Sequence, residues 1–89
     1  MTIKTLERIH NLLQEDVKRA ESERITAGRE EAKLARYYNV ACGHAYEHED
    51  EWKAGGKEDY EAKLIAAQTA SKAYSLSLDY LRDFESQDF

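Results

Sequence analysis

Apolar residues recur along this chain at alternating spacings of three and four, the repeat of a helix that packs along one seam. The first part of the seam comprises Ile3, Leu6, His10, Leu13, Val17, Ala20, Arg24, Ala27, Glu31, Leu34, Tyr38, Ala41, Ala45, His48 and Trp52. The second part comprises Tyr60, Leu64, Ala67, Ser71, Tyr74, Leu78 and Leu81. A mean repeat of about 3.5 residues is typical of coiled-coil-like helices and does not fit strands, whose side chains alternate every two residues. The pattern therefore predicts an all-α protein.

One strong break separates the two parts of the seam. Residues 53–57 read Lys-Ala-Gly-Gly-Lys, and two adjacent glycines allow the left-handed backbone that ends helices. Thr2 is a suitable N-cap for the first helix. We therefore predict helices over about residues 2–53 and 58–87, joined by a turn at 54–57. Together they form an antiparallel helical hairpin with long coiled-coil-like helices, and residues 1–89 make a single domain.

Gly28 leaves a second architecture open. One glycine costs about 1 kcal/mol inside a helix, and the seam around it is polar at Arg24 and Glu31. A break near Gly28 would give three helices of similar length and a compact three-helix bundle. The phase of the seam continues across Gly28, however, and this favours the long hairpin.

A neighbouring stripe widens the apolar face of the second helix. Its residues are Ala66, Ala70, Ala73, Tyr80 and Phe84. A helix with a face this wide is expected to touch more than one partner.

The unequal lengths of the two predicted helices point to an oligomer. A first helix over residues 2–53 extends well beyond a second helix over 58–87, so its N-terminal seam needs another subunit. The terminal phenylalanines either fold back on the hairpin or dock on a partner. We predict as interface anchors Ile3, Leu6, Leu13, Val17, Phe84 and Phe89.

Composition supports this expectation. Leu, Ile, Val and Phe make up only 16 of the 89 residues, and the hydrophobic fraction reaches 42% because alanine and tyrosine are frequent. A small chain with so thin a core usually depends on oligomerisation. We therefore predict a homo-oligomer, or a complex with another protein.

Charge and cysteine content narrow the function further. The net charge is −5, and residues 30–59 alone carry four basic and eight acidic side chains. This acidity repels phosphate backbones, so nucleic acid is not an expected partner. No window approaches 18 apolar residues, so we expect no membrane span. The lone Cys42 suits a reducing compartment, which predicts a cytoplasmic protein.

The sequence His44-Ala45-Tyr46-Glu47-His48 is the sharpest candidate for chemistry. Histidines four residues apart on a helix can both bind zinc, and this H-x-x-E-H order resembles the inverted zincin metalloproteases. Those enzymes are far larger and take a third ligand from a distant glutamate. We therefore expect no catalytic site and no cofactor; His44 and His48 remain weak candidates for metal binding. Cys42 is expected to pack as a small apolar side chain.

Two stretches of sequence resemble known families. Trp52-Lys53-Ala54-Gly55-Gly56, at a hairpin between two helices, looks like the WXG100 proteins of type VII secretion, acidic helical-hairpin dimers with Trp-x-Gly at the turn. The spacing here is Trp-x-x-Gly. The opening residues 6–9, the highly charged helical middle and the closing residues 80–89 are similar to small uncharacterised phage and prophage proteins of Gram-positive bacteria.

These observations predict a non-enzymatic protein that acts by protein–protein contact. The second resemblance implies an assembly or host-interaction role of phage or prophage origin, with another phage or host protein as partner and a virion-associated location as the alternative to the cytoplasm. The alternatives are a WXG100-like secretion substrate and a metal-binding protein that uses His44 and His48.

Overall fold

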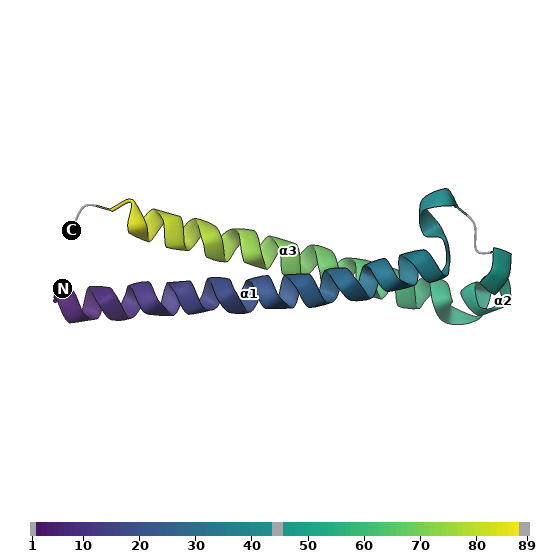
Figure 1. Cartoon of the computed structure of the whole chain (residues 1–89), viewed down its shortest axis with the longest axis horizontal. Helices are drawn as coiled ribbons and strands as arrows, with labels where there is room; N and C mark the ends of the chain where they lie inside the picture. The colour runs from purple at the N-terminus through teal and green to yellow at the C-terminus, as the bar shows by residue number, and fades with distance from the viewer. Residues whose placement is uncertain (1, 44–45, 88–89) are drawn as a thin grey trace.

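Two long antiparallel helices dominate the structure of this chain, a computed structural model that describes residues 2–43 and 46–87. Helix α1 (Ile3–Tyr37) and helix α3 (Lys57–Glu85) lie side by side, with the start of α1 and the end of α3 at the same end of the hairpin (Figure 1). The molecule measures 62 × 17 × 14 Å. The described residues contain no strand. The predicted all-α antiparallel hairpin is confirmed.

Helix α1 begins as the sequence predicts and continues through Gly28. The hydroxyl of Thr2 caps it by accepting a hydrogen bond from the N–H of Thr5 at 3.2 Å. The helix is unbroken from Ile3 to Tyr37, so the three-helix bundle is excluded. A Cβ on Gly28 would meet no neighbouring atom within 4 Å. Nothing in the packing therefore requires glycine at this position.

The predicted extension of the first helix to residue 53 is wrong, because α1 ends at Tyr37. Asn39 adopts a left-handed backbone with φ 51° and ψ 46°, which asparagine tolerates better than most residues and which ends many helices. The N–H of Tyr38 still donates to the carbonyl of Leu34 at 3.0 Å and closes the last turn. After Tyr38 the predicted seam positions therefore no longer lie along one continuous helix.

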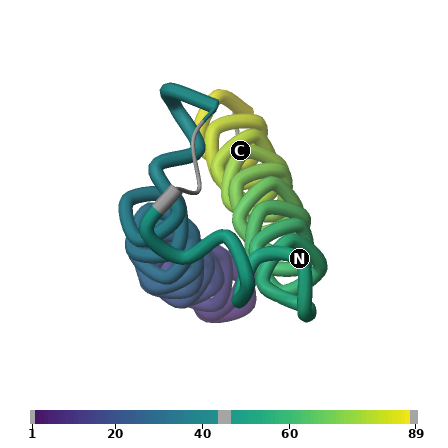
Figure 2. Tube along the Cα trace, turned by 90° about the vertical axis from the view of Figure 1, so that its right-hand side faces the viewer, coloured from purple at the N-terminus to yellow at the C-terminus, as the bar shows by residue number. Residues whose placement is uncertain are grey.

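A series of short turns occupies the region expected to be helical. These are the 3₁₀ turns η1 (Val40–Cys42) and η2 (Tyr46–His48), the single helical turn α2 (Glu49–Glu51) and the π-helical turn η3 (Trp52–Gly56). Gly43 and Gly55 have positive φ angles of 70° and 133°. The predicted break at residues 54–57 is therefore real at Gly55, but the reversal of chain direction is spread over about residues 38–56. Seen from this end, the connecting segment bridges the two helices (Figure 2).

Contacts between α1 and α3 set their register. The ring of His10 stacks on Phe84 with 5.7 Å between centroids. Further along, the guanidinium of Arg24 lies 4.8 Å from the centroid of the Tyr74 ring. This cation–π contact explains how a charged residue occupies the seam. Phe84 thus folds back on the hairpin; Phe89 lies outside the described residues.

The N-terminal seam is covered within the hairpin. Leu6, Leu13 and Val17 are half-buried, because α3 has 29 residues against the 35 of α1 and so runs beside most of it. The expected overhang of the first helix is wrong for this reason. Ile3, at the start of α1, is 74% exposed. The role of these side chains in contacts with another chain stays a prediction.

The interior of the hairpin is very small. Among the described residues, the buried hydrophobic side chains are only Ala20, Tyr38 and Tyr60, and no side chain is completely enclosed. The large hydrophobic residues exposed in the described part of the chain are Ile3, Leu12, Ile25, Tyr37, Ile65, Leu76 and Tyr80. No described helix combines the length and apolar character that crossing a membrane requires.

Candidate functional site

Five aromatic rings gather where the connecting segment meets the two long helices. This tip cluster consists of Tyr37, Tyr38, His48, Trp52 and Tyr60. The rings come from the end of α1, from the short turns and from the start of α3. Aromatic rings bury much area each, and the tip cluster contains two of the three buried hydrophobic side chains of the described residues, Tyr38 and Tyr60.

Tyr38 is the centre of the tip cluster. It is 7% exposed, and its ring centroid lies 4.9 Å from those of both Tyr37 and Trp52. Gly56 is buried under it: a Cβ on Gly56 would collide with the Tyr38 hydroxyl and ring and come within 2.9 Å of the Glu51 carbonyl oxygen. The absence of a side chain at Gly56 is what lets Tyr38 close over the connecting segment.

A second layer of the tip cluster links α1 to residues 48–51. The rings of Tyr37 and His48 stack at 3.8 Å with 13° between their planes. The Tyr37 hydroxyl donates to the Glu51 carboxylate at 2.6 Å. This hydrogen bond, together with desolvation and the negative charge of Glu51, raises the pKa of Tyr37 to about 12. The neutral phenol is the form that this arrangement stabilises.

Tyr60 provides the corresponding link between α3 and α1. It is 8% exposed, and its hydroxyl donates to the Glu31 carboxylate at 2.9 Å. The hydrogen bond, with desolvation and the charge of Glu31, raises the pKa of Tyr60. The carboxylate of Glu31 can therefore occupy the seam because it accepts a hydrogen bond from Tyr60 on the other helix.

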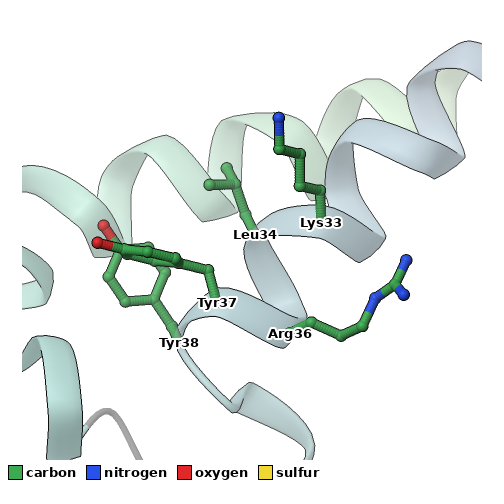
Figure 3. A pocket seen from close by; sticks show the side chains of 5 residues that line it. All are labelled: Lys33, Leu34, Arg36, Tyr37 and Tyr38. Atoms are coloured by element: carbon green, nitrogen blue, oxygen red, sulfur yellow. The ribbon is translucent and has the colours of Figure 1, made fainter.

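A hollow of about 610 Å³ lies beside the tip cluster, lined by Lys33, Leu34, Arg36, Tyr37 and Tyr38. Figure 3 shows the side chains of Lys33 and Arg36 extending away from the two tyrosine rings rather than converging on one point. The lining combines two basic side chains, two tyrosines and one leucine. Its polar groups do not converge on a common point.

Only one of the two residues predicted to bind metal lies within the described structure. His44 lies outside the described residues, and the ring of His48 is stacked on Tyr37, with Nδ1 3.6 Å from Glu51. Residues 2–43 and 46–87 contain no group of three or more His, Cys, Asp or Glu side chains placed to hold a metal ion. Cys42 is exposed, so its expected packing is wrong, because the chain has left the helix before it.

Sequence reasoning missed the tip cluster because its members belong to different elements. Tyr38 and Tyr60 lie on the predicted seam. The hydrogen bonds of Tyr37 with Glu51 and of Tyr60 with Glu31 have no signature in a single helix. A signal for the end of α1 was present, however. Asn39 and Gly43 are residue types that accept left-handed backbone, and both adopt it here.

The fold and the tip cluster together define a small helical hairpin whose connecting segment is closed by aromatic rings. No protein-family model, curated protein or solved structure matches the chain. Its function is therefore argued from its own geometry.

Alkaline pH is expected to destabilise the tip. Because folding raises the pKa of Tyr37 above about 10, the ordinary value for tyrosine, the contribution of its proton to stability is complete below about pH 10. It is lost as the pH rises through about 12. Glu51→Gln should lower the pKa of Tyr37, measured by the ultraviolet absorbance of tyrosinate during a pH titration. Asp50→Asn, which removes a neighbouring charge but not the acceptor, should leave the titration unchanged. Equal titrations for the two variants would contradict the assignment.

Proposed function

We propose that this chain is a non-enzymatic assembly protein that works by helix–helix contact with a second copy of itself. The observation that carries the proposal is the shortage of interior. Among the described residues, three hydrophobic side chains are buried, and several large ones face solvent. A hairpin of two helices that buries so little apolar surface gains little hydrophobic free energy. This gain must offset the entropy lost when the backbone is ordered.

The shape of the molecule supports the same proposal. Its radius of gyration is 19.0 Å, whereas a compact domain of this length has about 12 Å. A rod has more surface for its volume than a sphere, so much of its apolar area stays wet unless another chain covers it. Self-association of the rods provides that cover without any further folding.

Concentration-dependent stability tests the proposal. Anything that binds the native chain but not the unfolded chain raises the melting temperature by mass action. We expect purified full-length protein to show at least twice the monomer mass of 10.3 kDa by light scattering, and a Tm that rises with protein concentration. A monomer with a Tm independent of concentration would overturn the proposal.

The biological setting is a further part of the proposal. A phage or prophage origin, a cytoplasmic or virion-associated location and another phage or host protein as partner stay predictions of the sequence. A WXG100-like secretion substrate is favoured by one observation, that Trp52 lies at the tip of a helical hairpin. Metal binding through His44 and His48 has no comparable support.

A further inference from the structure

Helix α3 carries a second seam on the side that α1 does not cover. Its positions alternate by four and three residues and are Ala62, Ala66, Thr69, Ala73, Leu76 and Tyr80. All six are exposed in the hairpin, Leu76 by 51% and Tyr80 by 57%. Each of these positions lies two residues after a position of the second part of the predicted seam, here called the inner seam (Tyr60, Leu64, Ala67, Ser71, Tyr74 and Leu78). Since two residues rotate a helix by about 200°, this outer stripe points to the side of α3 away from the inner seam.

The six positions of the outer stripe carry no charged side chain, although charged residues are frequent in the rest of the chain. Residues 62–78 of α3 contain only two charged side chains, Lys63 and Lys72, in a chain that is 35% charged. Lys63 is paired with Glu30 across the hairpin at 2.9 Å. A solvent-facing helix usually carries charges on its outer face. The outer stripe therefore has the composition of a surface that is covered.

The outer face of α1 is different. Its shallow hollows are lined mainly by charged and polar side chains, including Lys4, Glu7, Arg8 and Glu15 near the N-terminus. A second such hollow includes Lys18, Glu21 and Arg29. Each hollow also includes one exposed hydrophobic residue, Leu12 or Ile25, but charged side chains predominate on this face. The contrast between the two helices selects α3 as the one that another chain covers.

The order of large and small residues along the outer stripe identifies the occupant. The stripe is symmetric about residue 71: reversing α3 places position 62 opposite 80, 66 opposite 76 and 69 opposite 73. Two alanines thereby face the two bulkiest residues, Ala62 against Tyr80 and Ala66 against Leu76. A two-fold interface requires this kind of self-complementarity, and alternating small and large side chains lets two helices interdigitate closely.

The surface area of the chain is large enough for such an interface. The chain exposes 6926 Å², and its mass is 10.3 kDa. A compact monomer of that mass exposes about 5,400 Å². The excess of about 1,500 Å² exceeds the roughly 800 Å² that each partner loses in a standard protein–protein interface. One additional helix-to-helix contact along α3 can therefore be accommodated.

We infer that two copies of this chain dock through the outer stripes of their α3 helices, antiparallel and around a two-fold axis near residue 71. The helices then lie in the order α1, α3, α3 of the partner, α1 of the partner, with the charged faces of α1 outside. This inference rests on the proposed self-association and assigns it to one face and one orientation.

A pair of charge insertions tests the face. Ala73→Glu places a carboxylate in the outer stripe, whereas Ser75→Glu places the same charge on an exposed position of α3 outside it. Both are solvent-exposed in the hairpin, so helical content by circular dichroism should be retained. We expect Ala73→Glu to raise the Kd of the dimer by about tenfold or more, measured by sedimentation, because an unpaired charge would be buried. Ser75→Glu should change the Kd little. A dimer that tolerates Ala73→Glu as well as Ser75→Glu would overturn the face while leaving self-association standing.

Disulfide trapping tests the orientation. In a Cys42→Ser background, oxidising a mixture of Ala66→Cys and Leu76→Cys chains should give cross-linked heterodimers, whereas Ala66→Cys chains alone should remain uncross-linked. Cross-linking of Ala66→Cys alone would indicate parallel helices and overturn the antiparallel arrangement. If the wild-type dimer forms but neither sample cross-links, the outer stripe is not the interface. A wild-type chain that is monomeric at every concentration would overturn both this inference and the proposed function.

Discussion

Tyr38→Ala is expected to lower the free energy of unfolding by about 3 kcal/mol, the usual cost of truncating a buried aromatic side chain. Tyr38 is one of three buried hydrophobic side chains in the described residues, and it contacts the rings of Tyr37 and Trp52. Removing its ring leaves a cavity that Gly56, having no side chain, cannot fill. For a hairpin with so small an interior, this is a large fraction of the total stability.

Trp52 makes this effect measurable at the tip itself. It is the only tryptophan in the chain, so its fluorescence reports the packing around Tyr38 while circular dichroism reports α1 and α3. Both signals should lose stability in Tyr38→Ala, compared with wild type at equal protein concentration. Tyr38→Phe keeps the ring and should cost less than about 1 kcal/mol. An unchanged denaturation midpoint for Tyr38→Ala would contradict the central role of the residue.

Gly56→Ala is expected to destabilise the protein by about 2 kcal/mol through overpacking. The added Cβ would collide with the buried Tyr38 ring and come within 2.9 Å of the Glu51 carbonyl oxygen. Tyr38 cannot move aside without losing its contacts with Trp52. The backbone of Gly56 is itself ordinary, with φ −62° and ψ −34°, so the expected effect is steric and not conformational.

Gly28→Ala is the matched control for this substitution. It adds the same methyl group, but to a helical glycine whose Cβ would meet nothing within 4 Å. Alanine is a better helix former than glycine, so we expect this variant to gain about 0.5–1 kcal/mol. Chemical denaturation should therefore move the two variants in opposite directions from wild type. If Gly56→Ala stabilised the protein, the expected collision between the added Cβ and Tyr38 would be contradicted.

Several features of the fold follow from the sequence because they depend on local chemistry. The seam from Leu6 to Tyr38 repeats every turn or two, and its inner face is half-buried or buried in the structure. Thr2 caps α1 because its hydroxyl reaches an N–H three residues away. Gly55 breaks the helix because its φ of 133° is open to glycine and strained for other residues.

The polar positions of the seam were harder to interpret. Arg24 and Glu31 indicate weak packing when α1 is considered alone. In the structure each has a partner on α3, the Tyr74 ring for Arg24 and the Tyr60 hydroxyl for Glu31. These pairs join residues about 30 to 50 positions apart in the chain, so no helical period in either segment could indicate them.

By itself, the sequence determined the helical class, favoured the continuity of α1 through Gly28 and indicated a wide apolar face on the second helix. These are periodic properties, and a helix expresses its periodicity wherever it lies. Asn39 is a residue type that can end a helix, but only the tertiary structure decided that α1 ends at Tyr37 and that the following residues close over the tip. Because the chain turns back this early, α3 runs beside the N-terminal seam, which a first helix extending to residue 53 would have left uncovered.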